Sequence, residues 1–365
     1  MELYVYDRNL VQLGLIEKIT SFIWTRRYWY VGGFQLLVPF TVRHAELLKK
    51  RHLITMRSDM EAGEIRFVEI RKNEHGKEEI EVTGQFISGW IGKRTVLNPI
   101  IMTAPPQQII NRLVTENVTN PTAADRRIED ITHAPIADIQ RPNVEYASEP
   151  FINVKLATKQ IAKAAQLGFN IAADIRQRRL FFNIYDGRDL TEDQQANPPA
   201  VFSMEFDNVL EQTFTNCIEN LRTVAYVGGE ATGNRPRRIV EVGNATGLDR
   251  DEVFINASDI LSQQIGDAQM NAQLTQRGIQ QLGYFAETLG FASKINQHAN
   301  LRYKTDYDLG DRVTCINQRW GVRINARITE ITETYQDHSK AQIDITFGES
   351  LPALTDQLRT LVMQK

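Results

Sequence analysis

Two short runs, Ile65-Arg66-Phe67-Val68-Glu69-Ile70 and Glu79-Ile80-Glu81-Val82-Thr83, carry the clearest structural signal in the chain. Both alternate apolar with polar residues, which is typical of half-buried strands. The polar stretch Asn73-Glu74-His75-Gly76-Lys77 between them contains a glycine, which allows positive φ. The sequence therefore predicts a β-hairpin here.

A similar pattern returns near the C-terminus. Leu53–Met56 precedes the hairpin, and the three strands together have an echo with similar spacing and low residue identity. The echo runs through Val313–Ile316, Ala326–Ile331, a turn over Gln336–Lys340, and Ala341–Phe347. It indicates two related β modules, the second assembled from about 201–230 and 301–348, although any three-stranded meander would give a comparable pattern.

The first hundred residues read as β structure throughout. A first turn is predicted at Asp7-Arg8-Asn9. The short β-rich runs around it are Leu3–Tyr6, Gly14–Ile16, Phe22–Arg26 and Phe34–Val38. Residues 1–100 are thus predicted to form the first β module.

Helical patterns begin after Trp90. Thr103, followed by Ala104-Pro105-Pro106, is predicted to cap a helix whose apolar stripe runs from Ile109 to Val114. Asn153 is predicted to cap a second helix, closed by Gly168. A hairpin of Phe169–Ala173 and Leu180–Tyr185 follows, so residues 101–200 are predicted to form a peripheral α/β insertion.

The second half alternates between the two kinds of structure. Strands are expected at Val201–Phe206 and Arg222–Val227, and a third helix from about Asp267 to Leu289. The chain is therefore expected to be α+β but mainly β, with the second module discontinuous. Its predicted parts are 201–234 and 301–350 for that module, 235–300 for an inserted segment with the helix, and 351–365 for a C-terminal tail.

Composition excludes several classes of protein. The chain has 365 residues, 42% of them hydrophobic and 24% charged, with a formal net charge of -3. This charge gives no general attraction to phosphate backbones or anionic lipid. No secretory signal and no apolar run of spanning length occur, so synthesis in the cytoplasm without membrane insertion is expected. Cys217 and Cys315 are too few for a disulfide framework and are expected to be buried thiols.

Motifs for catalysis are incomplete. The stretch from Gly228 to Arg235 has the glycine spacing of a phosphate loop but lacks its lysine. Gly348-Glu349-Ser350-Leu351-Pro352 has proline where a nucleophile elbow needs glycine. No nucleophile lies beside a base in a recognisable frame, so neither a catalytic site nor a cofactor is expected.

One aspartate-rich segment has two interpretations. Asp306, Asp308 and Asp311 could share a hard cation, yet Gly310 lies one place early for a calcium loop. A structural turn of Asp308, Gly310 and Asp311 is preferred, in which Gly310 has a backbone conformation costly for other residues. Gly310→Val should then destabilise the fold by roughly 1 to 3 kcal/mol. Calcium should leave the melting temperature unchanged.

An aromatic cluster includes Trp24, Trp29 and Tyr30, beside Arg26 and Arg27. Such side chains can stack on bases or sugars. Because they lie in strand-like sequence with no basic field, sheet faces and a subunit interface are the favoured interpretation. Trp24, Arg26, Arg27 and Trp29 are the candidate interface residues.

The order of several blocks resembles the siphophage tail-hub (tail-tip) protein family over essentially the whole chain. The blocks are Met1–Leu10, Ile23–Tyr28, Phe34–Pro39, Asn197–Ser203, Glu205–Leu210, Gly243–Arg250, Tyr307–Asp311 and Arg319–Val322. The resemblance implies a fold similar to the baseplate hub of contractile phages: two tube-type β-barrel modules with inserted α/β domains.

It also implies a homotrimer in a phage virion, presenting six similar barrels to a six-fold tail tube or distal tail ring. Expected partners are that ring, a tail fibre, spike or receptor-binding protein, and the tape-measure protein, with DNA passing without specific binding. The channel wall is expected to be neutral to acidic, with Arg26, Arg27 and Arg235–Arg238 turned away from it. A carbohydrate-binding tail module, stacking sugars on Trp24, Trp29 and Tyr30, and a cell-wall hydrolase remain the alternatives.

Overall fold

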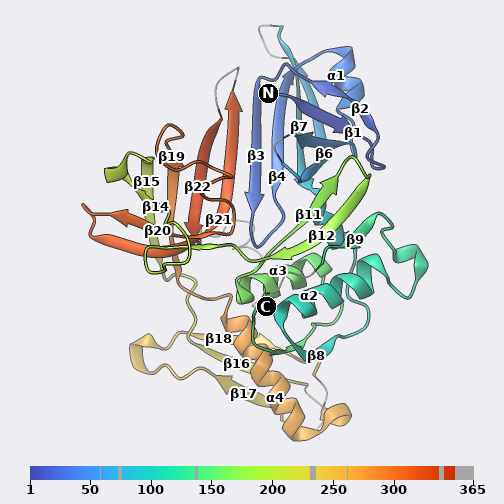
Figure 1. The fold of residues 1–365 in the computed structure, drawn as a ribbon. Helices are drawn as coiled ribbons and strands as arrows, with labels where there is room; N and C mark the ends of the chain where they lie inside the picture. The colour runs from blue at the N-terminus through green and yellow to red at the C-terminus, as the bar shows by residue number, and fades with distance from the viewer. Residues whose placement is uncertain are drawn as a thin grey trace.

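The computed structural model describes residues 1–57, 59–72, 76–135, 139–230, 236–260, 262–336 and 341–349. The fold is mainly β, as predicted, and its largest sheet has 14 strands (Figure 1). The N-terminal part of this sheet contains β1 (Leu3–Tyr6), β2 (Gln12–Ile16), β3 (Ser21–Arg27), β4 (Gly33–Pro39), β5 (Leu53–Met56), β6 (Ala62–Lys72) and β7 (Glu78–Phe86). A short helix, α1 (Val42–Leu47), joins β4 to β5.

The predicted hairpins of this part are confirmed. β6 and β7 pair antiparallel, and Gly76 has a φ of +78°. In the first turn the Asp7 carboxylate accepts hydrogen bonds from the backbone N–H groups of Asn9 (2.9 Å) and Val11 (2.8 Å). Short-range turn chemistry therefore fixes the register of β1 on β2.

The other part of the large sheet comes from the second half of the chain. It contains β13 (Asp189–Leu190), β14 (Val201–Ser203), β15 (Val209–Cys217), β19 (Thr288–Ile295), β20 (Arg312–Asn317), β21 (Val322–Gln336) and β22 (Gln342–Gly348). The sheet order runs β15-β19-β22-β21-β3-β4-β7-β6-β5-β1-β2, with β20 paired to β21 and to β13 and β14. The two halves of the chain therefore meet where β21 pairs with β3, and Figure 1 shows the strands in this order from β15 to β4.

The two halves have the same connectivity. β3, β4, β5, β6 and β7, the first repeat, pair in the order β3-β4-β7-β6-β5. β15, β19, β20, β21 and β22, the second repeat, pair in the order β15-β19-β22-β21-β20, and every contact within each repeat is antiparallel. The echo between the two meanders thus extends to five strands that occur in the same order along the chain.

Between the repeats lies a mixed α/β segment. It contains β8 (Ile101–Ala104), α2 (Pro106–Val114), β9 (Ile131–His133), β10 (Val144–Ala147), α3 (Val154–Ala165), β11 (Gly168–Asp174) and β12 (Arg179–Tyr185). Asn153 caps α3, accepting a hydrogen bond from the Lys155 N–H at 3.1 Å, as predicted. Two predicted caps are wrong: Thr103 lies in β8, and α3 ends at Gln166 in the left-handed conformation rather than at Gly168.

A separate small sheet interrupts the second repeat. It contains β16 (Val224–Gly228), β17 (Ile239–Val242) and β18 (Glu252–Asn256), covered by α4 (Ser262–Leu282). The prediction placed Arg222–Val227 in the second module and extended the helix to Leu289; both assignments are wrong. β16 pairs with β17 and β18, and Leu289 belongs to β19 in the large sheet.

Three apolar cores support these sheets. One spans the first repeat and the α/β segment, a second the second repeat, and a third the small sheet with α4. Trp24 lies in the first core and Phe291 in the second. No helix in the described ranges is both long and apolar enough to span a lipid bilayer.

Candidate functional site

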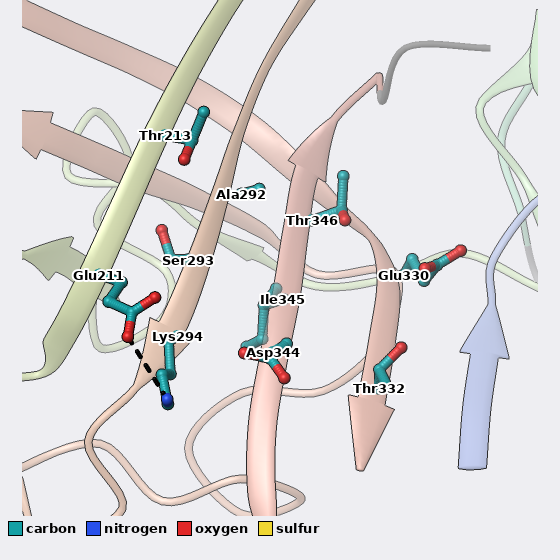
Figure 2. Close-up of a pocket in the computed structure, with 10 residues that line it drawn as sticks. All are labelled: Glu211, Thr213, Ala292, Ser293, Lys294, Glu330, Thr332, Asp344, Ile345 and Thr346. Atoms are coloured by element: carbon teal, nitrogen blue, oxygen red, sulfur yellow. Dashed lines mark hydrogen bonds and ion pairs between the residues drawn. The ribbon is translucent and has the colours of Figure 1, made fainter. Parts of the chain in front are cut away.

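One face of the large sheet is polar. It is formed by alternate residues that point away from the two cores, and it is hollowed by about 200 Å³ over β15, β19, β22 and β21 (Figure 2). The lining residues that belong to this face are Glu211, Thr213, Ala292, Lys294, Glu330, Thr332, Asp344 and Thr346. Ser293 and Ile345 also line the hollow, although their side chains are buried on the core side. A broad, shallow polar surface of this kind is suited to contact with a large molecule rather than to enclosure of a small one.

Direct contacts extend this polar face across the junction between the halves. The Arg27 guanidinium donates from Nε to Glu330 Oε2 at 2.6 Å, and the hydroxyls of Thr25 and Thr332 lie 3.1 Å apart. Because β3 and β21 alternate in step, the face continues from the second repeat onto the first.

Acidic side chains outnumber basic ones on this face. The strand pairings place Glu69, Glu79, Glu81, Glu211, Glu330 and Asp344 on it, against Arg27, Arg71 and Lys294. The three cations are paired with carboxylates of the same face, such as Lys294 with Glu211 at 3.4 Å and Arg71 with Glu81 at 3.1 Å. The face is thus acidic, with its cations neutralised locally.

The four candidate interface residues do not form one surface. Trp24 is fully buried in the first core, where its ring lies 4.3 Å from that of Phe86. Arg27 is exposed on the polar face, whereas Trp29 packs partly buried against the second core. The expected role of Trp24 in a subunit contact or a sugar platform is wrong, because its ring is already covered within the chain.

Arg26 lies in a buried ion cluster that joins distant segments. Its side chain is 11% exposed, and its guanidinium lies 2.7 Å from Asp308 Oδ1, 3.4 Å from Glu61 Oε2 and 3.6 Å from Asp59 Oδ2. Burial alone would lower the pKa of Arg26, but Asp59, Tyr303, Asp308 and Glu61 hold it well above its ordinary value. Arg26 therefore acts within the chain, and the expectation that it faces a subunit interface is wrong.

The other half of the cluster comes from β21 and the segment before β20. Tyr303 donates a hydrogen bond to Glu333 at 3.1 Å, and Lys304 Nζ lies 3.4 Å from Glu333 and 3.6 Å from Asp59. The Trp24 indole also donates to Asp59 at 3.1 Å. These contacts fasten the junction between β3 and β21 from the side opposite the polar face.

Glu61 should make this junction sensitive to pH. Burial and the charge of Asp59 raise the pKa of Glu61 to about 8, against the lowering effect of Arg26, from an ordinary value of 4.5. The folded protein then retains a proton that the unfolded chain releases, so stability falls as pH rises from 4.5 through 8.

We expect Glu61→Gln to remove this pH-dependent loss of stability. Relative to the variant, the free energy of unfolding of the wild type should fall by on the order of 2 kcal/mol between pH 5 and pH 8. Urea unfolding at a series of pH values measures the difference, with exposed Glu17→Gln as the matched control. Parallel profiles for wild type and Glu61→Gln would contradict this account of the cluster.

The segment from Tyr307 to Asp311 forms a turn held by side chains of this chain. The Asp311 carboxylate accepts from the backbone N–H groups of Arg188 (2.8 Å) and Asp308 (2.9 Å) and from the Arg188 guanidinium (2.6 Å). Asp308 accepts from Arg26 and from the Leu309 N–H, both at 2.7 Å. The two carboxylates are thus surrounded by guanidinium and amide donors. These donors stabilise the negative charge of the carboxylates and disfavour the binding of a calcium ion there.

Gly310 lies at the centre of this turn. Its φ is +94°, and a Cβ atom at this position would lie 2.4 Å from Cε2 of Tyr28. Its carbonyl oxygen accepts from Arg327 Nη1 at 2.5 Å, and Arg327 also contacts Asp186 at 3.1 Å. The turn, the end of β3 and the middle of β21 therefore pack around one glycine.

The described residues do not complete the remaining motifs of the sequence. Gly228 ends β16, and residues 231–235 of the phosphate-loop-like stretch lie outside the described residues, as do residues 350–352 of the elbow-like stretch. Within the described ranges, no group of three or more His, Cys, Asp and Glu residues is placed to hold a metal ion. Cys315 is buried, which raises the pKa of its thiol, whereas Cys217 is only partly buried.

The described residues thus combine a repeated sheet with a long acidic face. Comparison with protein families is more specific: residues 2–349 match the Siphovirus ReqiPepy6 Gp37-like protein family. The chain belongs to this family of phage tail proteins, which associates it with the tail of the virion. No curated protein sequence matches it.

Solved structures share the fold at low identity. The tail protein from Neisseria meningitidis MC58 is 13% identical, with a TM-score of 0.57 over 95% of this chain and 97% of that chain. The prophage MuSo2 43 kDa tail protein from Shewanella oneidensis is 11% identical, with a TM-score of 0.59 over 95% and 98%. Prophage tail protein gp18 from Listeria monocytogenes EGD-e is 12% identical, with a TM-score of 0.53 over 100% and 99%. The fold is therefore one that phage tail proteins adopt along their whole length.

Proposed function

We propose that this chain is the hub of a phage tail tip, and that three copies form a ring. The ring joins a six-fold tail tube or distal tail ring to three-fold fibre or spike proteins. The tape-measure protein and then the DNA pass through its channel. The protein is structural in this role and carries out no catalysis.

The repeated strand order is the observation that supports this proposal most. Each chain has two sets of five strands with one connectivity, so three chains supply six similar units to a six-fold partner. Each set is proposed to be one tube-type β-barrel module. Residues 101–200 and the small sheet with α4 are proposed to lie outside the ring, where they contact fibres or neighbouring tail proteins.

The polar face is proposed to line the channel. Its acidic side chains would repel the phosphate backbone, so duplex DNA could move along the wall without being held. Arg27 lies on this face, contrary to the expectation that it turns away from the channel, and is paired with Glu330. Arg26 lies on the opposite side of β3. Arg237 and Arg238 lie just before β17, where they donate hydrogen bonds to the Gly229 carbonyl and to Asn271 of α4.

Weak DNA binding tests the proposed wall. At low salt, where phosphate contacts are strongest, the purified trimer should show no tight binding of a short duplex in a fluorescence anisotropy titration. A control variant with Glu330→Lys and Asp344→Lys reverses the charge of two wall positions and should bind measurably. Tight binding by the unaltered protein would remove the argument for an acidic channel.

The two alternative functions lack support from side-chain geometry. Trp24 is buried in the core and cannot stack on a sugar. The Nζ atoms of Lys155 and Lys159 lie 5.2 and 4.8 Å from the centre of the Tyr30 ring. Glycan-array binding and peptidoglycan release by the purified chain would each favour one of these alternatives.

Mass measurement tests the proposed assembly directly. Analytical ultracentrifugation of the full chain over a range of concentrations should show a monomer giving way to a species of three copies, without a stable dimer or hexamer. A dimer or hexamer as the final species would contradict the hub proposal.

A further inference from the structure

Within the described residues β15 and part of β6 each have an edge without a strand partner, as does β2 at the other end of the sheet order. β15 pairs with β19 alone, and its other edge ends the sheet at the left of Figure 1. β6 pairs with β5 only through Ala62 to Glu64, so its outer edge beyond Ile65 is free. Unpaired backbone at a sheet edge is a template for pairing with another chain.

Exposed apolar side chains lie on the free edges of β6 and β15. Phe67 and Ile70 of β6 are 49% and 55% exposed, and Leu210 of β15 is 53% exposed. Phe214 of β15 is only partly buried against the second core. Apolar side chains at a free edge favour a covering partner, because the partner removes them from water.

The two repeats show which strand each edge should take. β15 corresponds to β3: Phe214 is opposite Phe291 of a Gly290-Phe291 pair, just as Trp24 is opposite Phe34 of Gly33-Phe34. β6 corresponds to β21. Both strands have a bulge at the same place, between Ile65 and Phe67 in β6 and between Ile328 and Glu330 in β21.

The junction inside the chain provides the geometry. β21 pairs antiparallel with β3, from Glu330 opposite Arg27 to Gln336 opposite Ser21. At this junction Trp24 is fully buried, whereas its counterpart Phe214 at the free edge is not. The free edge of β15 therefore resembles β3 with its β21 removed.

We propose that β6 of one copy pairs antiparallel with β15 of the next copy, in the register that β21 and β3 use inside each chain. Phe67 then lies opposite Cys217, as Glu330 lies opposite Arg27, and Ile70 lies opposite Phe214, as Glu333 lies opposite Trp24. The number of copies that closes the ring rests on the proposed hub function, whereas the strand partners and their register rest on the repeat.

A single substitution tests the register, because Cys217 is already in place. Under copper–phenanthroline oxidation, Phe67→Cys should form a disulfide with Cys217 of the neighbouring copy and give a ladder on non-reducing electrophoresis that ends at three chains. Adding Cys217→Ser should abolish the ladder. Val68→Cys, which projects from the other face of β6, should give at most weak cross-linking.

The equivalent junction inside the chain is the internal standard. In a Cys217→Ser background, Arg27→Cys with Glu330→Cys should oxidise to an intrachain disulfide under the same conditions, shown by mass spectrometry of peptides. If this standard oxidises while Phe67→Cys does not cross-link at the highest soluble concentration, the proposed edge pairing is wrong.

The hub function and the edge pairing fail in different ways. If the protein forms a species of three copies but Phe67→Cys gives no cross-link, the hub proposal stands and the proposed strand register is wrong. If the ladder continues past three chains, the proposed register stands and the ring of three copies is wrong. Cross-linking at Val68 in place of Phe67 would show a shifted register and would also overturn the proposal.

Discussion

Arg26→Ala should lower the free energy of unfolding by about 3 to 5 kcal/mol, because the variant removes the guanidinium that pairs with the buried Asp59 carboxylate and with Asp308. The side chains of Asp59 and Glu61 are 4% and 7% exposed, so water cannot replace the guanidinium. Urea denaturation monitored by tryptophan fluorescence measures the change, and Trp24 lies directly beside the cluster.

Its neighbour in sequence is the matched control. Arg27 pairs with Glu330 on the exposed polar face, where the two side chains are 41% and 33% exposed. Arg27→Ala should therefore cost at most about 1 kcal/mol. Adding Asp59→Asn to Arg26→Ala should recover part of the loss if charge is the cause. Equal effects of the two arginine substitutions would contradict the structural role of the cluster.

Gly310→Val should destabilise the fold by about 3 to 5 kcal/mol, more than backbone strain alone predicts, because the structure adds a steric clash to the strain at positive φ. The clash is with Tyr28, whose hydroxyl lies 3.2 Å from the carbonyl oxygens of both Gln166 and Tyr185. These bonds hold the hydroxyl end of the ring and the backbone holds the other end, so the ring cannot move aside without losing them. Thermal and urea unfolding of the purified variant give the magnitude.

Gly321→Val separates the strain from the clash. Gly321 has a φ of +66°, but no heavy atom lies within 4 Å of its ideal Cβ position. This variant should lose only about 1 to 2 kcal/mol, the cost of the left-handed backbone conformation. A loss at Gly321 as large as that at Gly310 would show that Tyr28 contributes nothing.

Local patterns in the sequence predicted the elements whose partners are close along the chain. The hairpin of β6 and β7, the Asp7 turn and the Asn153 cap each depend on residues within about twenty positions of one another. The third helix was extended too far because Phe285 and Leu289 continue a helical spacing. The pairing of Leu289 within β19, opposite Asn216 of β15, is what overrides this spacing.

Long-range contacts could not be read in the same way. Arg26 and Asp308 are 282 residues apart, and nothing in the sequence near Glu61 marks it as buried rather than solvated. The polar face could not be predicted from the sequence either, because it is formed by alternate residues of strands in both halves of the chain. The one long-range feature within reach was the echo between the meanders, because it compares two patterns and does not require their contacts.

The copy number of the ring in an assembled tail tests the central claim most directly. Averaged electron micrographs of isolated tail tips, viewed along the tail axis, should show three copies of this chain whose six similar units form a continuous wall. The insertions, residues 101–200 and the small sheet with α4, should appear as three-fold projections outside that wall. A ring containing six or two copies of the chain would contradict the account.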